Sequence, residues 1–167
     1  KALLFCVSVA HAEFMTAQLN AAGIAAACIV GATPMEERQR APQRLASGEL
    51  AAIVTCDLYN EGIDLPSIDT VLMLRPTESK VLFLQQLGRG LRRSAGKSHL
   101  VVLDFIGNHQ SFLHKPQALF GVGSTYKALA SFARKVERNQ LALPAGCYVN
   151  YDLGIISFLK ALDSSGP

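Results

Sequence analysis

The sequence predicts an α/β fold in three layers, with a parallel sheet between two layers of helices. Short apolar runs recur along the first two thirds of the chain, and amphipathic stretches with helix start and stop signals separate them. Runs of this length, rich in Val, Ile, Leu and Ala, are typical of buried strands. Five such strands are expected, at residues 2–7, 25–30, 52–56, 70–74 and 100–105.

Capping residues delimit the helices between these strands. Ser8 can cap a first helix over residues 9–22. The sequence Thr33-Pro34-Met35-Glu36 predicts a capping box with proline at the first helical position, and Gly48 closes this second helix. Pro42 removes an interior hydrogen bond, so we expect a kink or a break there. A third helix begins at Thr77 or Ser79.

The pattern changes after residue 105, and we place a domain boundary near Gly107. Domain 1–107 is therefore the sheet domain, and 108–167 is a mostly helical extension. Residues 106–123 look irregular, whereas 124–139 and about 153–162 predict helices. The inward side of the longer helix is expected to hold Leu129, Phe132, Ala133 and Val136. Its outer side, with Lys127, Arg134 and Arg138, is expected to be solvated.

The composition fits a soluble globular protein. Half of the 167 residues are hydrophobic, and no apolar run approaches the roughly 20 residues that span a bilayer, so we expect a cytoplasmic protein with no membrane partner. The four cysteines are scattered without metal-ligand spacing, which predicts reduced, structural thiols and no metal site. The net charge of +3 is too small to indicate a nucleic-acid binder by itself. Because the chain starts at Lys1, we expect a piece of a longer protein.

The stretch 85–93 places polar and cationic groups on one side of a predicted helix. The polar stripe holds Gln85, Gly88, Arg89 and Arg92, and an apolar stripe holds Leu84, Leu87 and Leu91. We expect the apolar stripe to pack and the polar one to face an anion. Two guanidiniums beside a glycine suit the oxygens of a phosphoryl group. Helical geometry alone does not distinguish this interpretation from an arginine-rich helix end that is only solvated.

A second motif lies upstream, at residues 55–66. It contains Glu61-Gly62-Ile63-Asp64 directly after an expected buried strand, where loops of α/β sheets build ligand sites. The glycine permits close backbone approach, and Asp64 can accept a hydrogen bond from a ribose hydroxyl or pair with an arginine. By itself this segment favours a capped turn that ends in Asp64-Leu65-Pro66.

Together, the two segments resemble motifs V and VI of superfamily 2 helicases, the second as Gln-x-x-Gly-Arg-x-x-Arg over 85–92. The resemblance implies a RecA-like P-loop NTPase fold. In those helicases the arginines reach the γ-phosphate from the second motor domain. It therefore implies Arg92 as the arginine finger, Arg89 as its neighbour and Gln85 as a coupling or water-orienting residue. Nucleotide contacts are implied for Gly62, Asp64 and Gly88.

Residues 4–8 resemble motif IV of the same helicases. This resemblance implies that Ser8 and His11 contact a nucleic-acid backbone, with Gly31 and Thr55 as further candidates. At the level of residues alone, Ser8 is explained as a helix N-cap and His11 as an exposed histidine. The loop nevertheless offers the free N–H groups and dipole of a helix N-terminus, which suit phosphate.

Two sequence features define what the chain lacks. Residues 90–98 imitate a phosphate loop, but five residues separate the glycines and the order runs from helix to strand, so we expect a turn at 95–98. No true phosphate loop and no acidic box occurs. The implied cofactors, ATP with Mg²⁺, would be held mainly by an absent N-terminal RecA-like domain. The full-length protein is expected to be an ATP-dependent helicase, and this piece alone is expected to be inactive.

Departures from the DEAD-box RNA helicases narrow the resemblance. Glu61 stands where those proteins carry Arg, and Gln85 stands where they carry His. The pattern is more similar to bacterial DEAD/DEAH-type helicases of the restriction-subunit and DNA-repair-like group, which favours DNA over RNA. Two alternatives stay open: a duplex DNA translocase subunit of a restriction or repair system, and a degenerate RecA-like module that binds a partner.

Overall fold

The computed structural model of the chain describes residues 1–56, 68–76, 79–91, 94–105 and 113–164. The chain divides into two compact units, residues 1–110 and residues 111–167.

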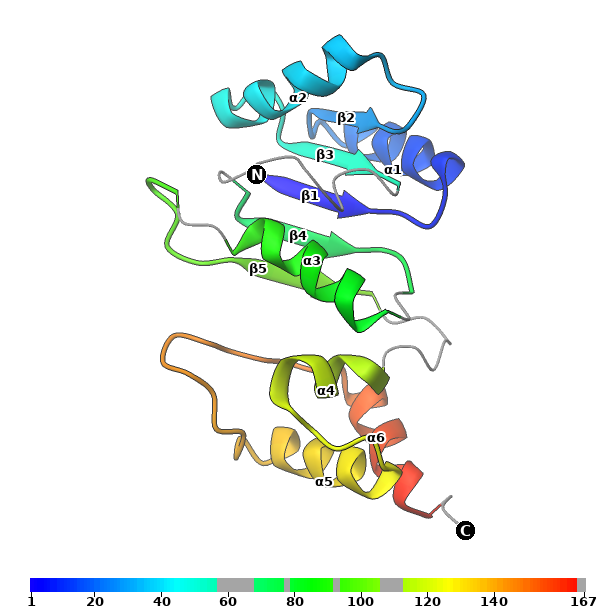
Figure 1. The fold of residues 1–167 in the computed structure, drawn as a ribbon, viewed down its shortest axis with the longest axis vertical. Helices are drawn as coiled ribbons and strands as arrows, with labels where there is room; N and C mark the ends of the chain where they lie inside the picture. The colour runs from blue at the N-terminus through cyan, green and yellow to red at the C-terminus, as the bar shows by residue number, and fades with distance from the viewer. Residues whose placement is uncertain (57–67, 77–78, 92–93, 106–112, 165–167) are drawn as a thin grey trace. The chain divides into compact units, whose positions relative to one another are not determined.

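The first unit contains the predicted sheet (Figure 1). Five strands run parallel in the order β2-β3-β1-β4-β5. Their bounds are β1 Ala2–Phe5, β2 Ala26–Ile29, β3 Ala52–Thr55, β4 Thr70–Met73 and β5 Val101–Asp104. The register pairs Ala2 with both Ala52 and Thr70, so the strands begin level and end level. The carboxyl ends of β1, β2 and β3 therefore lie at one edge of the sheet, which we call the carboxyl edge.

Helices α1 and α3 lie on opposite faces of this sheet. Helix α1, Val9–Ala21, packs Met15 and Leu19 against a cluster that includes Leu4 and Leu72. Helix α3, Lys80–Gly90, approaches Val71 and lies in front of β4 and β5 in Figure 1. Because successive strand residues face opposite sides, Val71 and Leu72 belong to different faces. The predicted three-layer α/β fold is confirmed.

The edge strand β5 is less buried than predicted. Its residues alternate between exposed and half-buried, with Val101 38% and Leu103 45% exposed. Strand β5 lies at the edge of the sheet and pairs only with β4 among the described strands. Helix α1 packs on β1, β2 and β3, at the opposite end of the strand order. The prediction of a fully buried fifth strand is therefore wrong, because apolar composition does not reveal how far the covering helix extends.

Helix α2, Met35–Ser47, departs from its predicted start. Its N-cap is Pro34, which offers no side-chain cap, and the hydroxyl of Thr33 instead accepts a hydrogen bond from the Val30 backbone N–H at 2.9 Å. The predicted capping box is wrong for this reason. The helix also continues through Pro42 without a break, since burial of Ala41 and Leu45 holds the residues beside the proline against the core.

The second unit is helical, but its first helix was not expected. It contains α4 His114–Phe120, α5 Tyr126–Glu137, α6 Leu153–Ala161 and a short 3₁₀ helix, η2, over Leu162–Ser164. The prediction that 106–123 is irregular is wrong at α4. Pro116 does not prevent this helix, because it lies in the first turn, where an N–H has no intrahelical acceptor.

Aromatic rings form the centre of the second unit. Phe132 of α5 is 3% exposed and stacks on Phe120 with ring centroids 5.3 Å apart. Tyr151 meets the same ring edge-on at 5.8 Å. Leu129 and Ala133 are buried beside Phe132, as the helical period predicts. This unit therefore has a core of its own. No described helix has the length and apolar character needed to cross a bilayer.

Candidate nucleotide and nucleic-acid interface

Ser8 begins α1 at the carboxyl edge of the sheet. Its hydroxyl accepts a hydrogen bond from the His11 backbone N–H at 3.1 Å, so Ser8 is the N-cap of α1 as predicted. The Nδ1 atom of His11 accepts from the Val7 backbone N–H at 3.4 Å. Ser8 is exposed and His11 is half-buried. The loop after β1 is therefore held by its own side chains and presents the N-terminus of α1 at the surface.

Gly31 follows β2 at the same edge and is exposed. Arg38 shapes this loop: its Nη2 donates to the Gly31 carbonyl at 2.7 Å, and its Nε donates to the Thr33 carbonyl at 2.6 Å. A side chain at Gly31 would meet no atom within 4 Å. The sequence motifs did not predict this role of Arg38. No sequence pattern identifies it, because the role depends on how the loop folds back onto α2.

Thr55 is the last residue of β3 and lies at the same carboxyl edge of the sheet. Its side chain is fully buried, and its hydroxyl donates to the Ile29 carbonyl at 2.7 Å. Thr55 thus joins β3 to β2, and its one hydroxyl proton is used inside the sheet. Its predicted contact with nucleic acid stays a prediction.

Helix α3 packs on a different side from the one predicted. The apolar stripe was expected to be buried, but Leu84 and Leu91 are 41% and 63% exposed. The side facing the sheet instead holds Phe83, Gln86 and Gly90. A Cβ atom at Gly90 would lie 2.5 Å from the Leu100 Cδ1 atom and 3.1 Å from the Val71 Cγ2 atom. The missing side chain lets the helix approach the sheet here, which fixes its rotation.

The polar stripe of α3 therefore lies on the outer half of the helix. Gln85 is exposed, and a Cβ atom at Gly88 would meet nothing within 4 Å. Arg89 follows Gly88 on the same helix, at four residues from Gln85, so the helical period brings these three positions to one side. The space at Gly88 is open to a ligand.

The described part of α3 ends before the last arginine of the predicted stripe. Helix α3 ends at Gly90 with Leu91 as its C-cap. Arg92, Gly62 and Asp64 lie outside the described residues, as does the side chain of Arg89. Their predicted contacts with nucleotide stay predictions.

Exposed apolar side chains border Gln85 and Gly88 on the same outer half of α3. Val81 is 65% exposed, Leu84 is 41% exposed and Leu91 is 63% exposed. We call these three residues the α3 patch. Apolar groups gathered around a polar stripe are typical of a surface that another protein domain covers.

Lys97, in the segment that imitates a phosphate loop, stabilises the turn after α3. The Lys97 ammonium donates to the Gly90 carbonyl, and the Lys97 backbone N–H donates to the Ser94 carbonyl at 3.1 Å. Burial lowers the pKa of Lys97, and the nearby Asp69 carboxylate partly offsets this effect. The turn expected at 95–98 is confirmed, with Gly96 at a φ of 78°. Lys97 therefore secures the end of α3.

The cysteines are free thiols, and three of them lie near the carboxyl edge. Cys6 and Cys56, which directly follow the neighbouring strands β1 and β3, are buried, Cys28 is half-buried and Cys147 is exposed. Burial, with smaller contributions from Cys56 and Cys28, raises the pKa of Cys6 to about 11. Within the described ranges, no three His, Cys, Asp or Glu side chains are placed to hold a metal ion.

A thiol-labelling experiment can check this assignment. At pH 8 only about 10⁻³ of Cys6 would be thiolate if its pKa is about 11, and the folded protein shields its sulfur. We expect a disulfide reagent to modify Cys147 at once and Cys6 only after unfolding in guanidinium. Peptide mapping by mass spectrometry would show which thiol reacted; equal rates at Cys6 and Cys147 in the native protein would contradict the buried site.

Comparisons with known proteins agree with this fold. Residues 1–94 match the helicase conserved C-terminal domain. The chain is 34% identical over 122 residues to a Saccharomyces cerevisiae protein named as the ATP-dependent helicase IRC3, covering 73% of this chain and 18% of that protein. It is 35% identical over 104 residues to the type I restriction enzyme EcoKI endonuclease subunit of Escherichia coli, covering 55% of this chain and 9% of that subunit.

Solved structures show the same fold. The C-terminal domain of the DEAD-box protein Dbp5 superposes with a TM-score of 0.62 at 20% identity, over 72% of this chain and 70% of that one. The chain spans less than a quarter of the length of the curated relatives above. Because the family match covers more than half of the residues, the chain belongs to the helicase conserved C-terminal domain family.

Proposed function

We propose that this chain is the C-terminal motor domain of an ATP-dependent nucleic-acid helicase, and that it completes an ATP site supplied mainly by an N-terminal RecA-like domain. The observation that carries the proposal is the outer half of α3. There Gln85 and the open space at Gly88 lie beside the α3 patch, with Arg89 next along the helix. A polar stripe bordered by exposed apolar groups suits a ligand held between two domains.

The residues of this surface fit a bound nucleotide phosphate. The Gly88 position leaves room for phosphate oxygens, the Gln85 amide can donate to an oxygen or orient a water molecule, and Arg89 and Arg92 supply fixed positive charge. ATP with Mg²⁺ supplies the phosphoryl group whose transfer releases energy. The role of this chain is to stabilise the negative charge that develops on that group, with Arg92 as the finger and Arg89 beside it.

The α3 patch supports the proposal of a second motor domain as partner. Val81, Leu84 and Leu91 would leave water when the two domains close, and closing would bring Gln85 and the arginines to the phosphate. The Gly62 and Asp64 loop is proposed to contact the same nucleotide. Opening and closing of the two domains would step them along nucleic acid.

The carboxyl edge of the sheet is the proposed nucleic-acid track. Ser8, His11 and Gly31 lie in loops that leave this edge, and the N-terminus of α1 offers backbone N–H groups to phosphate. Thr55 is left out because its side chain is buried. We propose DNA instead of RNA as the substrate, because a relative at 35% identity is named as a restriction-enzyme subunit.

The same relative supports a second candidate, a translocase that moves along duplex DNA without separating its strands. The two candidates share every residue of the proposed ATP site, so activity assays must separate them. A helicase displaces a strand from a partial duplex. A pure translocase displaces only the third strand of a triplex.

Gln85 provides a direct test of the proposed ATP site. In the full-length protein, we expect Gln85→Ala to lower DNA-stimulated ATP turnover on the order of 10²-fold, the loss that follows removal of one fixed donor from a reacting oxygen. ATP affinity should change little. Gln43→Ala, which removes an exposed amide from α2, is the matched control and should leave turnover unchanged. Equal turnover in the two variants would remove Gln85 from the site.

A further inference from the structure

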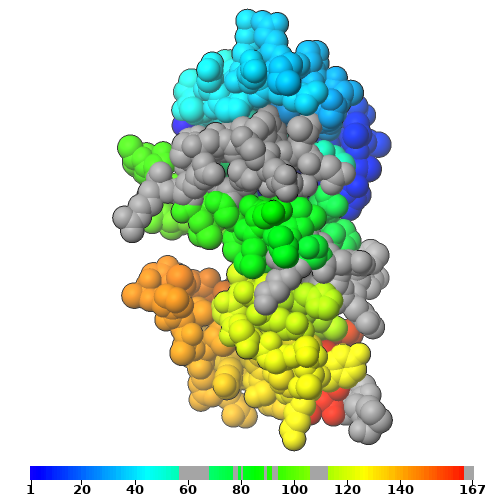
Figure 2. All heavy atoms as spheres, in the orientation of Figure 1, coloured from blue at the N-terminus to red at the C-terminus, as the bar shows by residue number. Residues whose placement is uncertain are grey.

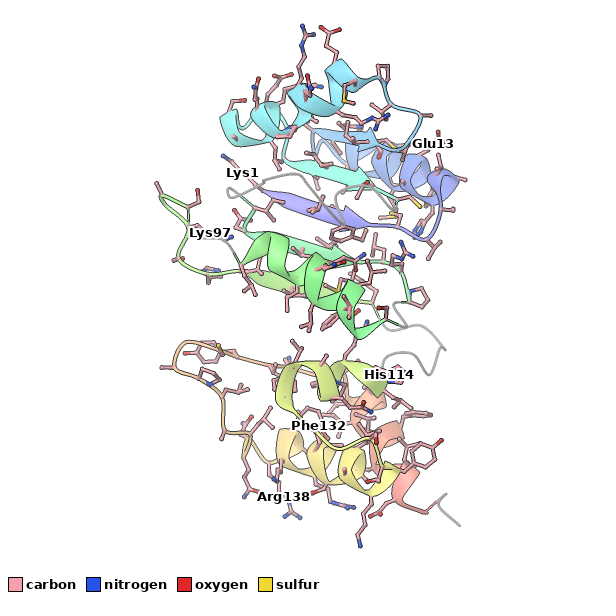
Figure 3. The ribbon with its side chains drawn as sticks, in the orientation of Figure 1. Lys1, Glu13, Lys97, His114, Phe132 and Arg138 are labelled. Atoms are coloured by element: carbon pink, nitrogen blue, oxygen red, sulfur yellow. The ribbon has the colours of Figure 1, made fainter. Side chains whose placement is uncertain are left out.

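Helix α5 presents a row of cations on the side opposite its buried face. Lys127, Lys135 and Arg138 are exposed, whereas Leu129 and Phe132 point into the second unit. Figure 3 shows Phe132 in the interior of this unit and Arg138 at its outside, and Figure 2 shows the α5 side chains at the molecular surface. At about 100° per residue, positions 127, 135 and 138 fall within about 80° of one another. We call these three residues the α5 basic face.

The acidic groups of this unit are all engaged elsewhere. The Glu137 carboxylate accepts from the Lys160 ammonium at 2.9 Å, and the Asp163 carboxylate accepts from the Arg134 guanidinium at 2.8 Å. The Asp152 carboxylate caps α6 by accepting from the Gly154 N–H at 2.7 Å. Residues 111–167 hold six basic and three acidic side chains, and residues 1–110 hold ten of each. The whole net charge of +3 therefore belongs to the second unit.

Pairing leaves that charge concentrated on α5. Of the six basic residues, Arg134 and Lys160 are in the two ion pairs and Lys115 is 6% exposed. The other three form the α5 basic face. Among the described residues, no acidic side chain makes an ion pair with any of them.

Helix stability does not explain this arrangement. Lys127 is the second residue of α5, two residues after the N-cap Thr125, and the helix dipole disfavours a cation in this first turn. Lys135 and Arg138 are three residues apart on the same side, so their charges repel. A basic residue in the last turn is favourable, but that argument applies to Lys135 and Arg138 only. The helix therefore tolerates an electrostatic cost, which suggests that the charges serve a ligand.

We infer that the α5 basic face binds the phosphate backbone of nucleic acid, outside the track at the carboxyl edge of the sheet. The row from Lys127 to Arg138 is about 16 Å long, which matches about five base-pair steps of a duplex. Three exposed cations that form no ion pair within the described part of the chain complement phosphates, and such contacts carry no sequence information. This inference rests on the proposed function, because a helicase or translocase supplies the nucleic acid that this face would hold.

The salt dependence of binding tests the inference. In the full-length protein without ATP, the triple variant Lys127→Gln, Lys135→Gln and Arg138→Gln should bind a duplex DNA more weakly, on the order of 10²-fold at 0.1 M salt. The slope of log K against log salt concentration should fall by about 2.7, since each phosphate contact contributes about 0.9. Fluorescence anisotropy with labelled duplex DNA, single-stranded DNA and single-stranded RNA measures both quantities. Single strands should lose about 0.7 per contact.

A charge-preserving variant is the matched control. Lys127→Arg, Lys135→Arg and Arg138→Lys keep three cations on α5 and should retain the affinity and the slope. Thermal unfolding should show that both triple variants are folded, and neutralising Lys127 should not lower the melting temperature. If the control loses as much affinity as the glutamine variant, the effect is not due to charge and the inference is wrong.

The remaining outcomes are also decisive. An unchanged affinity and slope in the glutamine variant would overturn the inference, even if an acidic protein partner were found to bind this face instead. Basal ATP turnover without nucleic acid should be unaffected in both variants, because α5 is not part of the proposed ATP site. If the proposed function is wrong, Gln85→Ala will leave ATP turnover unchanged, while the salt slopes of the wild-type protein and the glutamine variant can still differ. The two failures can therefore be distinguished.

Discussion

Replacing Arg92 with alanine in the full-length protein is expected to lower nucleic-acid-stimulated ATP turnover by about 10³-fold to 10⁵-fold, the range associated with an arginine finger. The reason is that the guanidinium stabilises charge that develops only during phosphoryl transfer. ATP affinity should therefore change far less than turnover. Steady-state ATPase assays with and without DNA, together with equilibrium binding of a fluorescent ATP analogue, measure the two effects.

Arg40→Ala is the matched control for this substitution. Arg40 is an exposed arginine of α2 that forms an ion pair at 2.7 Å with Glu36, one helical turn away. Exposed pairs of this kind contribute little to stability, so turnover should stay at the wild-type value. If Arg92→Ala and Arg40→Ala had the same turnover, Arg92 would not be the finger. A loss of ATP binding equal to the loss of turnover would assign Arg92 to ground-state binding instead.

Replacing Phe132 with alanine is expected to lower the free energy of unfolding of the second unit by about 3 to 5 kcal/mol. The ring is 3% exposed and contacts both Phe120 and Tyr151, so its removal leaves a cavity and breaks two aromatic contacts. Because residues 1–110 form a compact unit with their own core, they should keep their stability. Hydrogen exchange by mass spectrometry, followed in increasing urea, reports the two units separately.

Tyr126→Ala is the control for the aromatic core. Tyr126 is 44% exposed at the start of α5, and its truncation should change the free energy of unfolding by less than about 1 kcal/mol. An equal loss of protection in residues 1–110 of the Phe132→Ala variant would contradict two energetically separate units. A loss below 1 kcal/mol in that variant would contradict the central role of the ring.

Periodicity and capping residues sufficed to predict the sheet. The apolar runs at β1 to β4 are buried on at least one face, and Ser8 and Gly48 mark helix ends where they were expected. These features are local, because they depend on a few consecutive residues. Helix α4 was not predicted because the local pattern treats Pro116 as a helix breaker. A proline in the first turn costs no hydrogen bond, so the helix forms.

The packing of α3 could not be predicted from its pattern of leucines. Three leucines at helical spacing suggested the buried side, but the buried side is centred on Phe83, Gln86 and Gly90. The close approach of Gly90 to Val71 and Leu100 decides the rotation of the helix. Val71 precedes the helix on another strand, and Leu100 follows the turn after the helix, so the local pattern does not reveal either contact. The hydrogen bond of Thr55 to Ile29 is hidden in the same way, because it joins two strands. Motifs predict which residues face a ligand only after such contacts are known.

The central claim is that Arg89 and Arg92 reach a nucleotide held by a neighbouring motor domain. A crystal or cryo-EM structure of the full-length protein with ADP, Mg²⁺, a fluoride mimic of the phosphoryl group and DNA tests it directly. The account predicts guanidinium nitrogens of both residues about 3 Å from the mimic, with Gln85 and the α3 patch covered by the N-terminal domain. Both guanidiniums in ion pairs away from the nucleotide, with the α3 patch exposed, would contradict it.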